Sequence, residues 1–280
     1  MKKEGIIFAD IDGTLIFHEE IHNIQILNKS NDGLVRVFDS LTKKEYLTQN
    51  VSTNLYNIFL DVETKKLAQK LRDRFYFVFV SAARKSTMDL RKEVMNFADA
   101  YVLESGGLIL RGDYSPDDEW SKRFVSEKPH LDVMRQQLQD KGWILDIEGR
   151  TLALRVRKKD NPKKSDSDFE DLCTNIELPA QLRKTMNIGN LDVFVASAGK
   201  GNGVDHVISM LGFDKSQTIG IGDDINDIEM LNHTGKKYVL GSSYQGLLDI
   251  AQDKKWYISK GLHFDGINEI LMAIDKNSKV

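Results

Sequence analysis

Two aspartates, Asp10 and Asp12, follow a short apolar run near the start of the chain. The run is GIIFA at residues 5–9, and it leads into DIDGT at residues 10–14. Because side chains alternate along a β-strand, both carboxylates are expected on one face at the end of a strand, where their negative charges crowd together. This placement indicates a reactive site that needs a cation. A hairpin with a turn at Asp12-Gly13 is an alternative explanation of the same segment.

A second acidic segment lies far downstream. Another apolar run covers residues 217–221, and the loop GDDIND follows at residues 222–227. Two unit charges about 4 Å apart interact by about 4 kcal/mol at an effective dielectric constant near 20, so converging Asp10, Asp12 and Asp223 would repel one another strongly. The sequence therefore predicts a divalent cation. Because the candidate ligands are hard oxygen atoms, without cysteine or histidine, Mg²⁺ is favoured.

Two further residues could act on a phosphate group. Ser81 follows the apolar run at residues 77–80, and Lys200 lies in AGKG at residues 198–201. The Ser81 hydroxyl and backbone N–H could hold a phosphate oxygen, and Lys200 could offset the charge of a phosphoryl group transferred to a carboxylate. Taken alone, Ser81 also fits a helix N-cap or a satisfied strand-end hydroxyl, and Lys200 also fits a solvated lysine.

The elements that would position these residues form an α/β pattern. Short apolar runs separated by helix-length segments indicate the parallel strands of a doubly wound, Rossmann-like sheet, in which ligands bind beyond the carboxyl ends of the strands. The expected strands are residues 6–9, 75–80, 101–103, 218–221, 238–240 and 256–258, and the expected helices are residues 61–73, 86–98 and 204–211.

The middle of the chain changes pattern. Helices are expected at residues 127–140 and 165–175, and strands at 143–147 and 151–156, with a strand pair around 181–196. This order predicts an antiparallel sheet with helices on one face, which is an α+β cap inserted into the core. The expected domains are a catalytic core of residues 1–112 and 192–280 and a cap of residues 113–191, with the substrate between them.

Two features of this organisation leave alternatives open. Arg155 and Arg157 share one strand face, which implies a second anionic group on the substrate if that face lines the cleft, or solvated arginines if it does not. Residues 16–60 form a long excursion after the first strand, with a hairpin of residues 35–38 against 45–47, and such a segment is often a lid or an interface.

Composition limits the classes of partner. The chain has 280 residues, of which 41% are hydrophobic and 29% charged, and its net charge is −3. This balance does not favour nucleic acid or anionic lipid, and no window approaches the roughly 20 apolar residues of a membrane span. Cys173 is the only cysteine, so a reducing compartment is compatible. We expect a cytoplasmic monomer or homodimer that binds a small-molecule phosphorylated substrate.

The acidic and polar segments occur in an order that resembles the four motifs of the haloacid dehalogenase superfamily of phosphatases. These segments are DIDGT at residues 10–14, Ser81, Lys200-Gly201 and GDDIND at residues 222–227. A cap inserted between the second and third motifs resembles the branch with sucrose-phosphatase-like, mannosyl-phosphoglycerate-phosphatase-like and Cof-like enzymes. SAAR at residues 81–84 departs from the Thr-Gly-Arg sequence common there. The resemblance implies Mg²⁺-dependent hydrolysis of a sugar phosphate or similar metabolite through an aspartyl-phosphate.

The resemblance also implies catalytic roles. Asp10 is the implied nucleophile and a metal ligand. Asp12 is the implied general acid and base, and it binds the metal through its backbone carbonyl. Ser81 and Lys200 are implied to hold the phosphoryl group during transfer.

The remaining implied residues bind metal and substrate. Asp223 completes the protein ligands of the metal, and Asp227 orients Lys200 or the water molecules on the metal. The residues implied to contact the substrate are Gly13, Thr14, Ala82, Arg84 and Asn226.

Three other functions compete with this interpretation. HEEIH at residues 18–22 matches H-E-x-x-H, which on a helix presents His18 and His22 to zinc in a peptidase, although no third ligand is evident. A sugar phosphomutase would use the same motifs, and dependence on a bisphosphate activator would identify it. A non-enzymatic sensor would bind phosphate without turnover.

Overall fold

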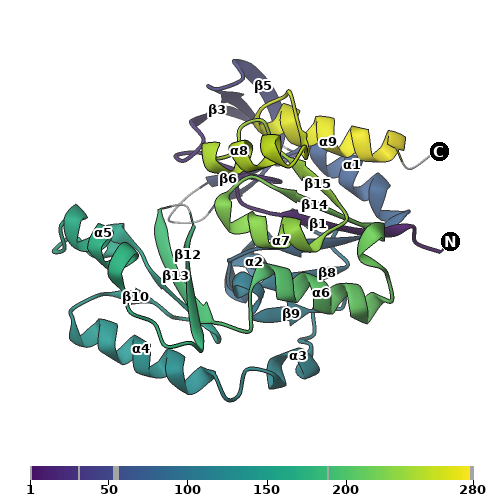
Figure 1. Cartoon of the computed structure of the whole chain (residues 1–280). Coiled ribbons are helices and arrows are strands. Elements are labelled where there is room, and N and C mark those ends of the chain that lie inside the picture. Colours follow the sequence, from purple (N-terminus) through teal and green to yellow (C-terminus); the bar gives the residue numbers. More distant parts are fainter. Residues whose placement is uncertain (1, 31, 53–56, 188, 278–280) are drawn as a thin grey trace.

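The computed structural model describes residues 2–30, 32–52, 57–187 and 189–277. Within these ranges the chain forms a seven-stranded, a four-stranded and a five-stranded sheet (Figure 1). The expected α/β class, with a largely parallel core and a separate antiparallel cap sheet, is confirmed. The strands of the seven-stranded sheet, in spatial order, are β16 (Tyr257–Ile258), β15 (Lys236–Val239), β14 (Thr218–Gly222), β1 (Gly5–Asp10), β7 (Phe75–Val80), β8 (Ala100–Leu103) and β9 (Leu108–Leu110).

The central strand β1 sits where the strand order changes direction. After the excursion that follows β1, the chain forms β7 and β8 on one side of β1. It later returns to form β14, β15 and β16 on the other side of β1. These strands are parallel, and only β9 among them runs antiparallel, beside β8. In such sheets the crevice for a ligand opens beyond the carboxyl ends of the strands at this point. The sequence pattern predicted the parallel strands but missed β9.

Alternate side chains of β1 enter two different apolar clusters. Ile6 and Phe8 pack with α6 (Lys200–Leu211), α7 (Ile228–His233) and α8 (Gln245–Asp253). Ile7 and Ala9 pack with α1 (Val62–Arg72), α2 (Lys85–Arg91) and α9 (His263–Asn277). Asp10 continues the register of Ile6 and Phe8, so it lies on the face that α6 covers.

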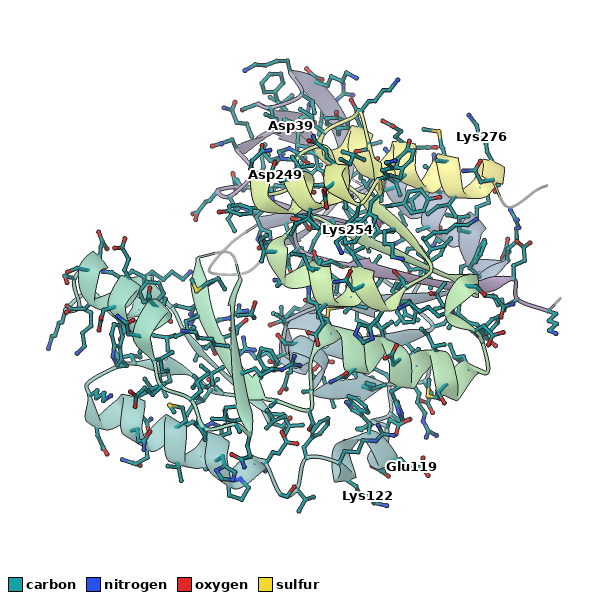
Figure 2. The ribbon with its side chains drawn as sticks, viewed as in Figure 1. Asp39, Glu119, Lys122, Asp249, Lys254 and Lys276 are labelled. Carbon is teal, nitrogen blue, oxygen red and sulfur yellow. The ribbon has the colours of Figure 1, made fainter. Side chains whose placement is uncertain are left out.

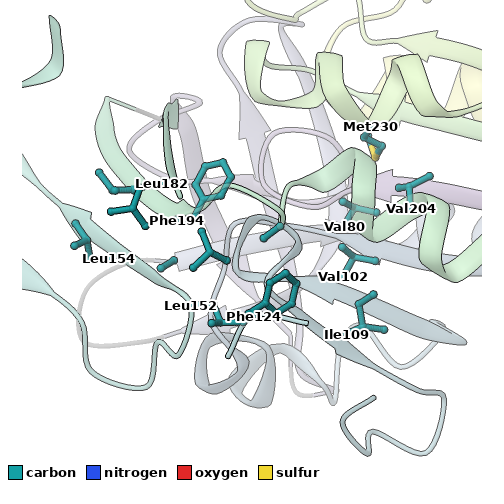
Figure 3. Close-up of a cluster of buried hydrophobic side chains, with 14 of the residues drawn as sticks. Val80, Val102, Ile109, Phe124, Leu152, Leu154, Leu182, Phe194, Val204 and Met230 are labelled. Carbon is teal, nitrogen blue, oxygen red and sulfur yellow. The ribbon is translucent and has the colours of Figure 1, made fainter. Parts of the chain in front are cut away.

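The first of these clusters continues from the core into the cap. Figure 3 shows Val80 and Val102 of the sheet beside Val204 of α6, with cap side chains such as Leu154 and Phe194 in the same cluster. Because one continuous set of buried side chains joins the two parts, burial of apolar surface holds the cap against the core.

Two expected helices differ from the observed ones. The helix expected at residues 86–98 is shorter in the structure. It ends at Arg91, and residues 92–94 form a turn in which the Val94 N–H donates to the Arg91 carbonyl at 3.1 Å. The helix expected at 204–211 begins earlier, at Lys200, where glycines conceal the helical pattern. Its end is as expected, since Gly212 has the left-handed φ of 71° that a C-cap needs.

The cap sheet is antiparallel and is followed along the chain by the return to the core. In spatial order its strands are β10 (Leu145–Asp146), β11 (Ala153–Val156), β13 (Asn190–Val195) and β12 (Leu182–Asn187). The helices of this region are α3 (Asp118–Lys122), α4 (Lys128–Asp140) and α5 (Asp166–Asn175). The division expected after residue 191 falls inside β13, since this strand continues to Val195.

The excursion after β1 is a third sheet. Its strands, in spatial order, are β2 (Phe17–His18), β6 (Asn57–Asp61), β5 (Lys44–Ser52), β4 (Leu34–Asp39) and β3 (Ile24–Lys29), all antiparallel. The expected hairpin is confirmed as β4 and β5, in which Val37 pairs with Tyr46. Residues 31 and 53–56 of the excursion lie outside the described residues. Val35 and Phe59 join the same apolar cluster as α9, so this sheet packs on the core.

The outer surface carries many charged side chains. Figure 2 shows Glu119 and Lys122 of α3 and Lys276 of α9 projecting away from the body of the protein. Among the described residues, none of the helices combines the length and the apolar composition that crossing a membrane requires.

Candidate active site

Adjacent strand ends bring the two acidic loops together. In the sheet register Asp10 pairs with Val80 of β7, and Ala9 pairs with Ile221 of β14, so the loops after the three strands begin at one edge. Oxygen atoms of Asp10, Asp223 and Asp227 all lie within 4.8 Å of one another. Segments more than 200 residues apart in the sequence therefore form one carboxylate cluster.

The environment of this cluster favours a bound cation. Burial, and then the charge of Asp227, raise the pKa of Asp10 well above its usual value. Burial and the charge of Asp10 do the same to the pKa of Asp223. These carboxylates gain charge stabilisation when a cation is present. An all-oxygen set of buried carboxylates fits Mg²⁺ by its ligand chemistry.

Lys200 lies against the cluster. Its Nζ donates hydrogen bonds to Asp10 Oδ1 and Asp227 Oδ1, both at 2.6 Å, and to Asn226 Oδ1 at 3.0 Å. Burial lowers the pKa of Lys200, but the two carboxylates outweigh burial and raise it, so the side chain stays protonated. Because only 3% of the residue is exposed, the interpretation of Lys200 as a solvated lysine is wrong.

Gly13 and Thr14 connect the first acidic loop to the second. A Cβ atom on Gly13 would lie 2.3 Å from Asp223 Oδ2, and the φ of Gly13 is +97°, so this position requires glycine. The Thr14 hydroxyl donates a hydrogen bond to Asp223 Oδ1. Of the two residues expected to contact the substrate, Thr14 therefore fixes the carboxylate of Asp223, a candidate metal ligand, and Gly13 leaves room for it.

The carboxylate of Asp12 has different partners from those expected. It accepts hydrogen bonds from Arg91 Nη1 at 2.9 Å and Arg91 Nη2 at 2.8 Å, and His18 Nε2 lies 2.7 Å from its Oδ1. The expected convergence of the Asp12 side chain with Asp10 and Asp223 is therefore wrong. β1 ends at Asp10, so strand alternation no longer fixes the direction of Asp12.

These partners control the charge of Asp12. Burial raises the pKa of its carboxyl group, but the Arg91 guanidinium and the hydrogen bond from His18 outweigh burial and hold the pKa well below its usual value. Arg91 is 3% exposed, and its two-point contact fixes the orientation of the carboxylate as well as its charge.

Ser81 and Arg84 follow β7 at the same edge of the sheet. The Ser81 Oγ accepts the backbone N–H of Ala83 at 3.0 Å, so it caps a turn and not a helix, and its hydroxyl proton can be donated elsewhere. Arg84 Nη1 donates to Asp146 Oδ1 and to the Glu148 carbonyl, both at 2.6 Å. The Ala82 carbonyl accepts a hydrogen bond from the cap as well.

The H-E-x-x-H match does not form the site that a zinc peptidase requires. His18 lies in the strand β2, and His22 lies in a turn, where its Nδ1 accepts the backbone N–H of His18 at 2.9 Å. Over the part of the chain that the structure describes, the carboxylate cluster is the only group of three or more candidate ligands close enough to hold a metal ion. The peptidase interpretation is therefore wrong.

The two arginines of β11 and its end face a cavity. Arg155 and Arg157 line a cavity of about 200 Å³ together with Asp12, and Arg155 binds Asp192 through two hydrogen bonds of 2.6 and 2.7 Å. The solvent-facing alternative is therefore wrong for Arg155, whereas Arg157 lines the cavity and keeps 26% of its side chain exposed.

Sequence reasoning missed Arg91 and Arg150. Both are buried cations, and Arg91 follows the buried Met88 by three residues on the inner face of α2. A charged residue at an apolar-face position signals a buried charged partner, and this signal could have identified Arg91.

Comparisons with known proteins agree with this geometry. A family model described as haloacid dehalogenase-like hydrolase matches residues 94–271. A phosphoglycolate phosphatase from Sulfolobus acidocaldarius is 42% identical over 52 residues, which are 19% of this chain and 23% of that protein. A Streptococcus pyogenes relative is 30% identical over 116 residues, which are 39% of this chain. That alignment covers 24% of the relative, so the chain matches about a quarter of the length of each.

Solved structures share the fold over nearly the whole chain. The sucrose-phosphatase of Synechocystis sp. PCC6803, in complex with sucrose and phosphate, has a TM-score of 0.65 at 15% identity and covers 98% of this chain and 99% of its own. A sugar phosphatase of haloacid dehalogenase subclass IIB has a TM-score of 0.61 at 14% identity and covers 97% of this chain and 99% of its own. The family model matches more than half of the sequence, and the chain belongs to the haloacid dehalogenase-like hydrolase family.

Proposed function

We propose that this protein is a Mg²⁺-dependent phosphatase that hydrolyses a small phosphorylated metabolite, such as a sugar phosphate, through an aspartyl-phosphate. One observation carries the proposal: protonated Lys200 contacts Asp10 and Asp227 within a buried cluster of three carboxylates. Family membership and the phosphatase names of the similar proteins support the same reaction class.

The residues of the cluster can perform two displacements at phosphorus. A carboxylate oxygen of Asp10 forms a bond to phosphorus while the bond from phosphorus to the leaving oxygen breaks, and the leaving oxygen takes a proton. Water then attacks the same phosphorus atom and releases phosphate, which regenerates Asp10. Lys200 offsets negative charge on the phosphoryl oxygens, and the Ser81 hydroxyl can donate a hydrogen bond to one of them.

The metal would be held by Asp10, Asp223, Asp227 and the backbone carbonyl of Asp12. When bound, Mg²⁺ neutralises carboxylate and phosphoryl charge at this site. Thr14 and Gly13 keep Asp223 in place for that task, and Asp227 also fixes the position of Lys200.

Arg91 and His18 hold Asp12, the proposed general acid and base, in one orientation. They also keep its pKa low in the free protein, so its role as acid requires the negative charge of a bound phosphate ester to raise that pKa before it donates a proton. We expect Arg91→Lys to lower kcat by about tenfold to a hundredfold with little change in KM, because lysine cannot make the two-point contact and the carboxylate shifts. Steady-state kinetics will measure this effect. Arg36→Lys is the matched control, since Arg36 lies on the surface and pairs with Glu45. An unchanged kcat in Arg91→Lys would show that this contact does not position Asp12.

A screen of phosphorylated metabolites tests the proposal. With Mg²⁺, the wild-type protein is expected to release inorganic phosphate from at least one compound, and EDTA is expected to stop the release. Asp10→Asn serves as the blank. A phosphomutase would instead isomerise the substrate and depend on a bisphosphate activator. Equal release by the blank, or no turnover of any compound, would contradict the proposal.

The setting of the reaction is part of the same proposal. We infer a cytoplasmic monomer or homodimer that binds neither nucleic acid nor membranes. The net charge of −3 and the single cysteine support this setting.

A further inference from the structure

The cavity beside Asp12 is lined by an unusual number of cations. Its volume is about 200 Å³, and it lies between the core, the cap and the first residues of the excursion after β1, which forms the five-stranded sheet. Its lining includes Lys159 and the five arginines 84, 91, 150, 155 and 157. Two of these arginines are neutralised by carboxylates of their own, since Arg91 binds Asp12 and Arg155 binds Asp192.

The other three arginines share one carboxylate in the cavity wall. Asp146 lies 2.6 Å from Arg84 Nη1, 3.4 Å from Arg150 Nη2 and 4.0 Å from Arg157 Nη1. Arg157 also pairs with Asp160 outside the lining. Among the described residues, Asp146 is thus the only carboxylate that forms an ion pair with Arg84 or Arg150, and Glu20 is the remaining carboxylate of the lining.

Arg150 is the least compensated member of this group. It is 8% exposed, and its Nε has no hydrogen-bond partner among the described residues. Burial, and then the positive charge of Arg155, lower its pKa, and the carboxylates of Asp192, Asp146 and Glu104 offset this effect only in part. A buried cation without full compensation is costly, so an anion in this cavity would be stabilised.

The cavity is placed to receive the leaving group of the proposed reaction. Asp12 belongs to its lining and lies two residues after the proposed nucleophile Asp10, and Ala83 and Arg84 of the lining follow Ser81. A leaving oxygen that takes a proton from Asp12 must lie beside Asp12 and hence beside this cavity. The volume is below the roughly 300–1,000 Å³ of sites for drug-sized ligands, which indicates a small leaving group.

We propose that this cavity binds a second anionic group, a carboxylate or a phosphate, on the leaving group of the substrate, with Arg150, Arg84 and Arg157 as its contacts. The substrate class is then a phosphate ester of a small sugar acid or hydroxy acid, or a small bisphosphate, in place of a neutral sugar phosphate. This inference rests on the proposed phosphatase function.

Binding to the Asp10→Asn protein with Mg²⁺, measured by isothermal titration calorimetry, tests the inference without turnover. Three matched pairs differ by one anionic group: 6-phosphogluconate and sorbitol 6-phosphate, 3-phosphoglycerate and glycerol 3-phosphate, and fructose 1,6-bisphosphate and fructose 6-phosphate. We expect the more anionic member of at least one pair to bind about tenfold to a hundredfold more tightly, as for a charge-assisted hydrogen bond. A preference within the first two pairs would indicate a site for a carboxylate, and a preference within the third pair would indicate a site for a phosphate.

Arginine variants in the same background locate the effect. Arg150→Gln is expected to reduce the preference to less than about threefold, whereas the surface control Arg36→Gln should keep it. If Arg150→Gln does not fold, Arg157→Gln takes its place, because the Arg157 side chain is partly exposed and its replacement should disturb the fold less. Arg157→Gln should reduce the binding preference by about threefold to tenfold. Absence of any preference, or a preference that survives both cavity variants, would overturn the inference.

Failure of the phosphatase proposal would give a different pattern. The wild-type protein would then release no phosphate from any of the six compounds, while the anion preference in binding and its loss in Arg150→Gln would persist. If the protein hydrolyses the pair members that lack the second anionic group and shows no preference for it in binding, the phosphatase proposal stands and the proposed anion site is refuted.

Discussion

Replacement of Asp10 by asparagine is expected to abolish phosphate release, with kcat lowered by at least about 10⁴-fold. An amide oxygen is a very weak nucleophile, so the first displacement at phosphorus should not occur in this variant. Asp10→Asn should still fold, because Lys200 keeps its contacts with Asp227 and Asn226. Steady-state phosphate release and circular dichroism will measure the two effects.

A matched control separates loss of the nucleophile from a general loss of carboxylate charge. Asp249 lies exposed on α8 (Figure 2) and is not one of the three carboxylates of the cluster, so Asp249→Asn should keep wild-type kcat. If Asp10→Asn folds and retains more than about a hundredth of the wild-type kcat, another group must attack phosphorus.

Asp223→Asn is expected to remove the response of the protein to Mg²⁺. A ligand that binds only the folded state stabilises it by about 2.7 kcal/mol at a concentration one hundred times its Kd, so Mg²⁺ should raise the Tm of the wild-type protein. The variant lacks one of three carboxylates in the cluster, and its Tm should hardly change with Mg²⁺. Phosphate release by Asp223→Asn should also fall, because the variant no longer binds the metal.

The neighbouring Asp224 supplies the control for this prediction. Its side chain caps the turn η4 (Ile225–Asp227) and does not belong to the carboxylate cluster. Asp224→Asn should therefore keep a Mg²⁺-dependent rise in Tm. An equal rise in Asp223→Asn and in the wild-type protein would place the metal elsewhere.

The parts of the fold that could be predicted from the sequence are those whose pattern is local. Parallel strands buried on both faces appear as continuous apolar runs, which is why β1, β7 and β14 were predicted at nearly their observed bounds. The acidic loops follow directly from two of these strands. Placing Asp10 and Asp223 near each other needed only the rule that parallel strands end at one edge of a sheet.

The parts that could not be predicted depend on contacts between distant segments. The five-stranded sheet of the excursion has strands such as β3 (Ile24–Lys29), in which most residues are polar or exposed. The alternation of apolar and polar residues that identifies a strand is therefore weak there. Arg91 lies 79 residues from Asp12, and its contact depends on where α2 packs against the core. Neither composition nor periodicity contains that information.

The wrong direction expected for Asp12 has a similar cause. Alternation predicts side-chain direction only within a strand, and β1 ends two residues before Asp12. The H-E-x-x-H match identified His18 as notable but assigned it to zinc, whereas the structure places it beside Asp12.

The most direct test of the central claim is to identify the residue that carries the phosphoryl group during turnover. Asp12→Ala is expected to bind Mg²⁺ and substrate but to hydrolyse the intermediate slowly, since no base activates water. Mass spectrometry of peptides from this variant, acid-quenched with a substrate found in the screen, should locate one phosphoryl group on Asp10. A phosphoryl group on another residue, or near wild-type turnover by Asp12→Ala with no phosphorylated peptide, would contradict the account.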